Sequence, residues 1–392
     1  MKNSWQTKKL EDVCNIVGGG TPSKINESFY TGKILWATVR DMKSDIIEDT
    51  EYKITEEAIK NSSTNIIPKN NVIIATRVGL GKVCFSKYDM AVNQDLKGII
   101  PRDTNRLSVC YLYWWLKSTS NIIEENGTGA TVQGVKLSFI KNLRIPLPSL
   151  LEQKRIVKIL DEVFEEVGKA KENAEKNLRN SRELFESYLQ SVFENKGEGW
   201  GERRLGDVCG TGAGGTPLKS HKEYYENGEV PWLRSGEVNK KEVMRSKVFI
   251  SEAGLNNSSA RMFPINTVLI AMYGATAGQV GILKFASSTN QAVCGILPNK
   301  KFSADFLYYV FLSKKKELVS QAVGGAQPNI SQIKIKDTFI PVLELSEQKA
   351  IVKKLDALSE ETKKLEEIYK KEIADLEELK KSVLQKAFRG EL

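Results

Sequence analysis

The chain is a tandem duplication, and this feature constrains its fold more than any other. The segment KKLEDVCNIVGGGTPSK (residues 8–24) aligns without a gap with RRLGDVCGTGAGGTPLK (residues 203–219). The segment LRIPLPSLLEQKRIVKILD (residues 143–161) matches TFIPVLELSEQKAIVKKLD (residues 338–356) at the same offset of 195 residues. Because repetition at a fixed offset indicates one structural unit that is built twice, we expect two copies of one architecture.

Each copy has two parts. The first part mixes β-branched runs with turns rich in Gly, Pro and Asn and with short helical patches, which predicts a compact α+β domain. The second part lacks proline after its first residues and carries apolar residues at heptad spacing, which predicts a long helix. The predicted segments are a first globular domain (1–148), a central helix (149–196), a second globular domain (197–343) and a C-terminal helix (344–392).

The two predicted helices need a partner for their apolar stripes, and the simplest partner of each is the other. The link NKGEGWGE between the first helix and the second domain could span about 28 Å at most, whereas the helix is about 68 Å long. A parallel pair would place both lobes at the same end or need a much longer link, so an antiparallel pair is favoured. We expect a pseudo-two-fold α+β protein with an antiparallel coiled coil. The residues predicted to pack along the helices, or against other subunits, are Ile156, Leu160, Val163, Val167, Leu184, Ile351, Leu355, Leu358, Leu365, Leu376 and Leu379.

The composition points away from a catalytic centre. Five cysteines form no CxxC pair and His221 is the only histidine, which argues against a disulfide framework, a zinc site and a Ser-His-Asp triad. Cys14 and Cys209 occupy equivalent positions and are predicted to be buried packing residues. The string GTGAGG (210–215) fits a dinucleotide motif, but a Thr-Pro follows it and the first copy breaks it. We expect no catalytic residue, metal or cofactor in this chain.

The net charge of +9 is carried by the globular domains. They contribute +5 and +6, whereas each helix contributes −1. This placement favours an anionic partner for the domains, although solubility explains the charge equally well. The chain has no apolar run long enough for a membrane span and begins without the apolar core of a signal peptide, so we expect a cytoplasmic protein without a membrane partner.

The order domain, helix, domain, helix resembles the specificity subunit of type I restriction-modification systems. The strings that carry the resemblance are LEDVCNIVGGGTPSK, TRVGLGKV, IPLPSLLEQKRIVKILD, their second copies and the C-terminal LQKAFRGEL. The resemblance implies two target-recognition domains, each of which recognises one half of a bipartite double-stranded DNA site. It also implies two methyltransferase (M) subunits that bring S-adenosylmethionine, and restriction (R) subunits that use ATP and Mg. The specificity subunit itself would catalyse nothing.

DNA contacts are expected where the copies differ, because the two half-sites differ. Arginine binds guanine through two hydrogen bonds, so Arg40, Arg77 and Arg234 are candidates for base recognition. The lysines of the glycine-rich loops, together with backbone N–H groups, are candidates for phosphate contacts, while a purely structural turn remains the alternative. The complete set of predicted DNA-binding residues is Thr21, Ser23, Lys24, Arg40, Arg77, Lys136, Thr216, Lys219, Arg234, Tyr273, Gln327 and Asn329.

Residues that both copies share are expected to be structural. Asn93-Gln94 and Asn290-Gln291 are predicted to form hydrogen bonds within the protein, and Trp36 and Trp232 are predicted to lie in the core. Two other classes of function remain open from the sequence. One is a self-sufficient methyltransferase, which the missing Asn/Asp-Pro-Pro-aromatic motif argues against, and the other is a coiled-coil adaptor that binds only proteins.

Overall fold

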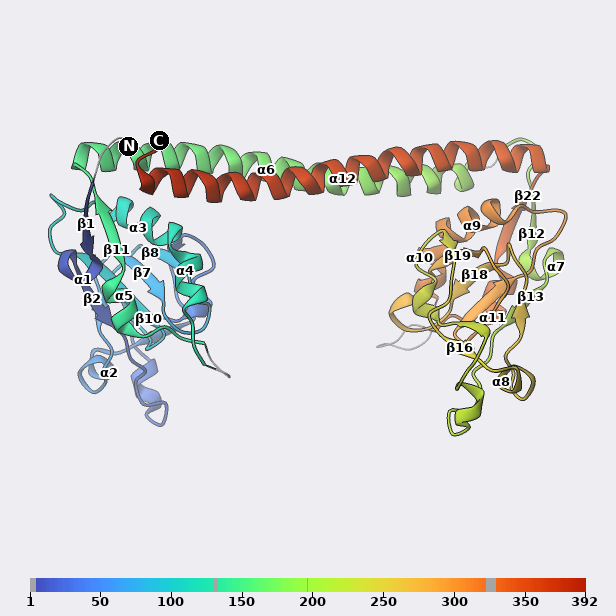
Figure 1. Ribbon diagram of the computed structural model, residues 1–392, viewed down its shortest axis with the longest axis horizontal. Helices are drawn as coiled ribbons and strands as arrows, with labels where there is room; N and C mark the ends of the chain where they lie inside the picture. Colours follow the sequence, from blue (N-terminus) through green and yellow to red (C-terminus); the bar gives the residue numbers. More distant parts are fainter. Residues whose placement is uncertain (1–4, 130–132, 196, 322–328) are drawn as a thin grey trace. The chain divides into compact units, whose positions relative to one another are not determined.

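The computed structural model describes residues 5–129, 133–195, 197–321 and 329–392. It divides into two compact units. The first unit contains Met1–Glu175 and Lys371–Leu392, and the second contains Lys176–Lys370. Each unit therefore combines one globular lobe with parts of both long helices (Figure 1).

The globular lobe of the first unit, here the first lobe, is built on three sheets. Its strands are β1 (Gln6–Lys9), β2 (Cys14–Gly18), β3 (Ile34–Ala37), β4 (Ile46–Ile47), β5 (Tyr52–Ile54), β6 (Ile66–Ile67), β7 (Val72–Ala75), β8 (Val83–Ser86), β9 (Met90–Val92), β10 (Leu96–Pro101) and β11 (Arg144–Leu147). Five strands form one sheet in the order β2-β10-β7-β8-β4, four form a second in the order β5-β3-β9-β6, and β1 pairs with β11. β7 and β9 are buried along their whole length, so they form the centre of the lobe.

Five short helices complete the first lobe. They are α1 (Leu10–Val13), α2 (Glu56–Lys60), α3 (Val109–Ser118), α4 (Ser120–Glu125) and α5 (Leu137–Asn142). The sequence of α3, VCYLYWWLKS, is apolar around nearly the whole helix, and its residues 111–116 are all buried. A helix that is apolar on all sides is buried between other elements, and α3 packs against both the sheet and the long helix above it (Figure 1).

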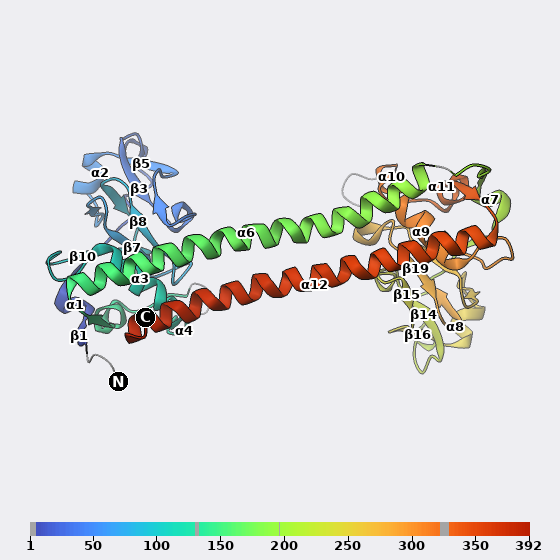
Figure 2. The same cartoon turned by 90° about the horizontal axis from the view of Figure 1, so that it is seen from above.

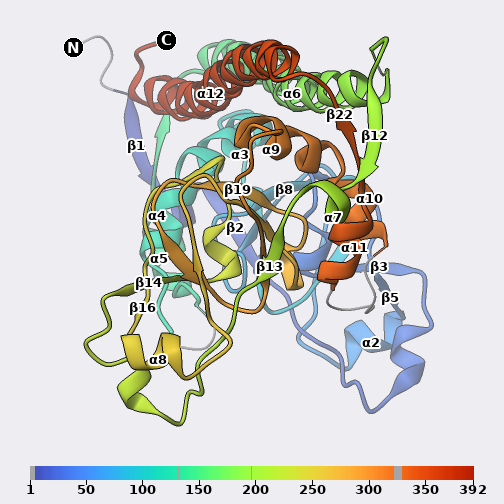
Figure 3. The ribbon, with the colours of Figure 1, turned by 90° about the vertical axis from the view of Figure 1, so that its right-hand side faces the viewer.

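The second lobe repeats the first. Its strands are β12 (Gly201–Arg204), β13 (Thr211–Ala213), β14 (Val230–Leu233), β15 (Glu242–Val243), β16 (Phe249–Ile250), β17 (Met262–Phe263), β18 (Val268–Ala271), β19 (Val280–Leu283), β20 (Ser287–Thr289), β21 (Val293–Ile296) and β22 (Phe339–Val342). Its helices are α7 (Leu205–Val208), α8 (Glu252–Asn256), α9 (Ala304–Ser313), α10 (Lys315–Ser320) and α11 (Gln332–Asp337). The sheet orders β13-β21-β18-β19-β15 and β16-β14-β20-β17 correspond strand by strand to those of the first lobe. As β1 does with β11, β12 pairs with β22 (Figure 3). The predicted duplication is therefore confirmed.

The long helices are α6 (Leu150–Glu194) and α12 (Leu345–Arg389), of 45 residues each. Within the first unit, Lys171 forms an ion pair of 2.5 Å with Glu377, and Arg155 donates a hydrogen bond of 2.8 Å to a backbone oxygen of Leu392. Within the second unit, Arg182 pairs with Glu366 at 3.0 Å. Residue numbers rise along one helix as they fall along the other, so the pairing is antiparallel in each unit, as predicted (Figure 2).

The seam of the long helices, meaning the row of less exposed residues along each helix, differs from the predicted row at alternate positions. Ile156, Leu160, Val167 and Leu355 are buried, and Val163, Ile351, Leu358 and Leu376 are half-buried. In contrast, Leu184, Leu365 and Leu379 are 52%, 37% and 44% exposed, so they do not belong to the buried seam between the helices, and their packing against other subunits stays a prediction. The neighbouring residues Phe185, Glu366 and Lys380 are less exposed and follow the seam instead.

The cause of this difference is the geometry of the helix. A strict heptad repeat alternates steps of four and three residues, whereas a straight helix has 3.6 residues per turn and drifts away from that repeat. In α6 the less exposed positions continue from Ala170 through Ala174 to Leu178, which are two successive steps of four. In α12 two successive steps of four lead from Ile351 through Leu355 to Ser359. Beyond Ser359, every second residue of the seam lies one position later in the sequence than predicted.

The two ends of the described chain meet in the first unit. Trp5, Phe388 and Leu392 pack against the same apolar cluster, and the Trp5 ring lies against Gly390. Met1 itself lies outside the described residues. Trp200 is the counterpart of Trp5 in the second unit, where its indole N–H donates a hydrogen bond of 2.6 Å to Glu347 at the start of α12. Each lobe thus begins beside the long helices of its own unit.

A buried glutamine fastens each long helix to its lobe. The side-chain oxygen of Gln153 accepts a hydrogen bond of 2.9 Å from the Ser108 N–H, and its amide donates to the carbonyls of Arg106 and Pro148 at 2.8 and 3.0 Å. Gln348 makes the equivalent three bonds in the second unit. Both side chains are fully buried, and each amide forms hydrogen bonds with three backbone groups, so its own polar atoms are satisfied.

An aspartate two turns further along each helix provides a second attachment. The Trp114 indole N–H in α3 donates a hydrogen bond of 2.8 Å to Asp161. The Tyr309 hydroxyl in α9 donates one of 2.5 Å to Asp356. Because the attachments lie eight residues apart on each helix, they fix both its position and its rotation on the lobe.

Candidate nucleic-acid interface

The glycine-rich loops after β2 and β13 are required by close packing. A Cβ added to Gly19 would lie 2.1 Å from the carbonyl oxygen of Val92, and one added to Gly214 would lie 2.2 Å from that of Thr289. Atoms cannot approach so closely, so these positions accept only glycine. The structural explanation of the repeated loop is therefore confirmed at these two positions.

Backbone groups of these loops are bonded within the protein. Gly20 N–H donates to the Val92 carbonyl at 3.0 Å, and Gly215 N–H donates to the Thr289 carbonyl at 2.9 Å. The carbonyls of Gly20 and Gly215 accept from the indoles of Trp36 and Trp232 at 3.1 and 2.9 Å. The N–H groups of Gly20 and Gly215 are thus not free for phosphate, and in each loop the lysine is the better placed group.

Three of the four residues of the shared Asn-Gln pairs have the predicted structural role, whereas the buried side-chain oxygen of Asn290 has no hydrogen-bond partner among the described residues. The hydroxyl of Thr21 donates to the side-chain oxygen of Gln94, and that of Thr216 donates to Gln291. Asn93 donates to the Asp95 carboxylate at 3.0 Å and accepts from the Asp95 N–H at 3.1 Å. Trp36 and Trp232 are each only 4% exposed, so their predicted place in the core is also confirmed.

The first lobe has a cavity of about 520 Å³ into which several predicted residues converge. Its lining consists of Thr21, Lys24, Trp36, Thr38, Val39, Arg40, Tyr52, Val78, Asn93, Gln94 and Asp95. Lys24 comes from the glycine-rich loop, whereas Arg40 lies on the 3₁₀ turn η2 (Val39–Asp41). The fold therefore brings three predicted residues, Thr21, Lys24 and Arg40, to one concave site.

Two arginines with exposed side chains lie at this cavity, Arg40 in its lining and Arg77 beside the lining residue Asp95. Arg40 lies 3.7 Å from Glu51 and its side chain is 78% exposed. Arg77 lies 3.6 Å from the lining residue Asp95, and its side chain is 49% exposed. Neither distance is that of a close ion pair, so both guanidinium groups keep donors for a ligand. Lys136 and Ser23 are also exposed, and Lys136 follows two residues after Gly134, which bridges to Arg77.

The second lobe carries different side chains on the equivalent elements. Arg234 precedes the 3₁₀ turn η4 (Ser235–Glu237), and its guanidinium lies 5.7 Å from the centre of the Trp232 ring. Tyr273 takes the place of Arg77, is 38% exposed and bridges to Asn329. Lys219 is exposed like Lys24. Gln327 lies outside the described residues.

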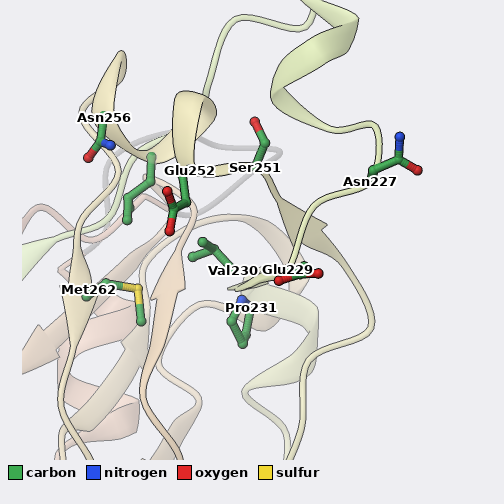
Figure 4. Close-up of a pocket in the computed structure, with 9 residues that line it drawn as sticks. Asn227, Glu229, Val230, Pro231, Ser251, Glu252, Asn256 and Met262 are labelled. Atoms are coloured by element: carbon green, nitrogen blue, oxygen red, sulfur yellow. The ribbon is translucent and has the colours of Figure 1, made fainter.

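A separate pocket in the second lobe contains none of the predicted residues (Figure 4). It measures about 590 Å³ and is lined by Asn227, Glu229, Val230, Pro231, Ser251, Glu252, Leu255, Asn256 and Met262. Its two ionisable lining residues, Glu229 and Glu252, are both acidic. Carboxylates repel phosphates, so this pocket is not suited to the DNA backbone.

The described residues show no constellation that suits metal or thiol chemistry. Across residues 5–129, 133–195, 197–321 and 329–392, no group of three His, Cys, Asp or Glu side chains could hold a metal ion. Cys14 and Cys209 are buried, as predicted, and burial raises the pKa of the Cys14 thiol to about 12. Such a thiol stays protonated near neutral pH and is a poor nucleophile. In the same described ranges, no helix is apolar over a length that would cross a bilayer.

The sequence alone did not single out every residue of the first-lobe cavity. Tyr52, Val78 and Asp95 line it but were not predicted, because they come from separate segments that only the folded sheets bring together. Val78 had one sequence signal, since it stands opposite a glycine of the second copy.

Comparison with known proteins identifies the family. The model of the type I restriction modification DNA specificity domain matches twice, over residues 2–176 and 197–375. The chain belongs to this family. The two matches correspond to the two repeats, so family and internal duplication agree.

Named relatives extend this result. The specificity subunit of the type I restriction enzyme MjaIX from Methanocaldococcus jannaschii is 28% identical over 362 residues, which cover 86% of this chain and 83% of the relative. The EcoR124I/EcoR124II specificity subunit of Escherichia coli is 27% identical over 294 residues, which cover 72% of this chain and 71% of the relative. These relatives confirm the prediction of a specificity subunit, which is not itself the enzyme of the system.

Solved structures share the fold over the whole chain. One comes from a study of complex assembly and conformational transition of the type I R-M system, with a TM-score of 0.81, 21% identity and coverage of 99% of this chain and 98% of the other. The HsdS subunit of Thermoanaerobacter tengcongensis has a TM-score of 0.65 at 20% identity and covers 100% and 98% of the two chains. The specificity subunit described here therefore has the fold of these proteins.

Proposed function

We propose that this specificity subunit recognises a bipartite double-stranded DNA target, with one half-site for each lobe. The observation that carries the proposal is that one scaffold occurs twice with different exposed side chains at equivalent positions. Arg77 of the first lobe corresponds to Tyr273 of the second, while the sheets and the Thr-Gln hydrogen bonds beneath them are the same. A common scaffold with divergent contact residues is what two unlike half-sites require.

The charge distribution supports DNA as the ligand of the lobes. The first and second domains carry +5 and +6, whereas the helices are each −1. Lys24, Arg40 and Arg77 lie in or beside one cavity and have exposed side chains. Cations at this position would replace the counterions of the DNA backbone, and the arginines would also form hydrogen bonds with guanine in the major groove.

The partners follow from this role. We propose that two M subunits dock on the subunit and bring S-adenosylmethionine, and that R subunits add an activity that depends on ATP and Mg. The repeated lobes and helices support two equivalent M subunits, because each repeat offers a similar surface. We place the assembled complex in the cytoplasm, where chromosomal and incoming DNA are both accessible.

The test of base recognition by the first lobe is Arg77→Ala. If Arg77 binds a guanine through two hydrogen bonds, the variant should lose about 1–3 kcal/mol in binding to the correct site, but much less on a site changed at that base pair. The measurement is the affinity of the complex with M subunits for a panel of single-base variants of the target.

The matched control is Arg144→Ala, which removes an exposed arginine of β11 outside the cavity lining. It should leave the preference at every base pair unchanged. An equal loss of affinity by Arg77→Ala on all sequences would make Arg77 a phosphate contact and contradict its role in base recognition.

A further inference from the structure

Val78 has a backbone conformation that is unfavourable for valine. Its φ angle is +47°, in the left-handed region. Among the residues that the structure describes, the other non-glycine residues with positive φ are Asn70, Asn227 and Asn266. Asparagine tolerates this region, whereas the branched Cβ of valine clashes there with its own backbone. The fold therefore holds Val78 in a strained state.

The second lobe has a glycine with positive φ at the position that aligns with Val78. The string ATRVG of residues 75–79 aligns with AMYGA of residues 271–275, which places Gly274 opposite Val78. Gly274 has a φ angle of +68°, and a Cβ added to it would have no atom within 4 Å. Both lobes thus have a left-handed residue three positions after the end of β7 or β18, although the first lobe continues with left-handed Gly79 and the second with the 3₁₀ turn η5 (Gly274–Thr276). Only the first lobe has a side chain that makes this conformation unfavourable.

Packing of the Val78 side chain does not compensate for this strain. The residue is 50% exposed, and its neighbours Arg77 and Gly79 are exposed as well. An exposed valine recovers little of the free energy that full burial would supply. The side chain therefore stabilises neither the turn nor the core, and the reason for its presence lies outside the folded chain.

The surroundings of Val78 indicate its ligand. It lines the same cavity as Lys24, Arg40 and Gln94, directly after Arg77. It is an apolar group on a rim of cations and hydrogen-bonding groups. In the major groove of DNA, arginines recognise guanine, while the apolar group that base pairs offer is the 5-methyl group of thymine.

We propose that Val78 is a specificity-determining residue of the first lobe, and that its methyl groups contact the 5-methyl group of a thymine in the first half-site. This inference rests on the proposed recognition of DNA by the lobes. In the free protein the left-handed turn presents an exposed apolar group next to Arg77, in a cavity that Arg40 also lines. On DNA this group is buried against the thymine, while the arginines bind neighbouring groups.

The test uses the complex of this subunit with its M subunits and the variant Val78→Gly. Each thymine of the first half-site is replaced in turn by deoxyuridine, which lacks only the methyl group. For the wild-type protein, one replacement should lower the affinity about fourfold, since one buried methyl group contributes about 0.8 kcal/mol. The Val78→Gly complex should bind the thymine and deoxyuridine sites equally.

Thermal stability supplies a second measurement, in which Val78→Gly should show a gain rather than a loss. Because glycine adopts a positive φ without strain, Val78→Gly should raise the melting temperature of the first unit by about 2–4 °C while thymine discrimination is lost. The control Gly274→Val introduces the same strain into the second lobe. It should lower that unit's melting temperature and leave recognition of the first half-site unchanged.

The outcomes separate this inference from the function on which it rests. A wild-type complex that shows no sequence preference would refute the proposed function itself. A sequence-specific complex that ignores every thymine methyl of the first half-site, or a Val78→Gly variant that still discriminates, would refute the role of Val78 alone. A half-site without thymine would refute it as well.

Discussion

Replacement of Gly19 by alanine is expected to destabilise the first unit by about 3 kcal/mol, at the upper end of the range for overpacked sites. The added Cβ would lie 2.1 Å from the Val92 carbonyl oxygen and 2.3 Å from that of Asn93. Both atoms belong to the backbone at the end of β9, which pairs with β3 and β6, so neither can move without disturbing the sheet. The loop would have to separate from the sheet, and Lys24 would move with it.

The neighbouring glycine gives a matched control for this variant. A Cβ on Gly18 would meet only the side chain of Lys97, at the ordinary contact distance of 3.8 Å. Gly18→Ala should therefore leave stability nearly unchanged. The measurement is thermal unfolding of both variants beside the wild type, where 3 kcal/mol corresponds to a shift of about 6–12 °C for a unit of this size. Similar melting temperatures for Gly18→Ala and Gly19→Ala would contradict the close-packing explanation of the loop.

Replacement of Gln153 by alanine is expected to cost about 2–4 kcal/mol and to loosen α6 from the first lobe. The variant would leave the Ser108 N–H and the carbonyls of Arg106 and Pro148 without the side-chain amide that bonds them. Buried polar groups without partners are each destabilising by about 1–3 kcal/mol, although entry of water into the space left by the side chain would offset part of this.

Hydrogen exchange at one amide reports this effect directly. The Ser108 N–H should exchange much faster in Gln153→Ala than in the wild type, because its acceptor is gone. Gln385→Ala, which removes an exposed glutamine of α12 in the same unit, should leave the exchange of Ser108 unchanged. If the Ser108 amide remained equally protected in both variants, Gln153 would not be the attachment of the helix to the lobe.

The architecture could be predicted because it is repeated. Each short strand is ambiguous by itself, but the alignment of two copies made one fold explain both halves. The antiparallel pairing followed from the short link between α6 and the second lobe. The phase of the helix seam could not be obtained in this way, because a heptad count ignores the drift that places Phe185 rather than Leu184 in the seam.

The candidate site was only partly visible in the sequence. Lys24 could be selected as the lysine of the repeated glycine-rich loop, and Arg40 from its residue type and from the difference between the copies. Their convergence on one cavity with Asp95 depends on the pairing of β3 with β9, which joins segments more than 50 residues apart. The strain at Val78 arises from its positive φ angle, which the sequence does not show. The alignment of Val78 with Gly274 was the only sequence signal of that angle.

The central claim is that each lobe recognises its own half of one DNA target. The most direct test replaces residues 1–148 with the corresponding domain of a relative of different specificity, and sequences the methylated sites of cells that express the chimaera with its M subunits. The account predicts that one half of the methylated motif changes, while the other half and the spacing between the halves remain the same. A change in both halves together, or a motif that is unaltered, would contradict it.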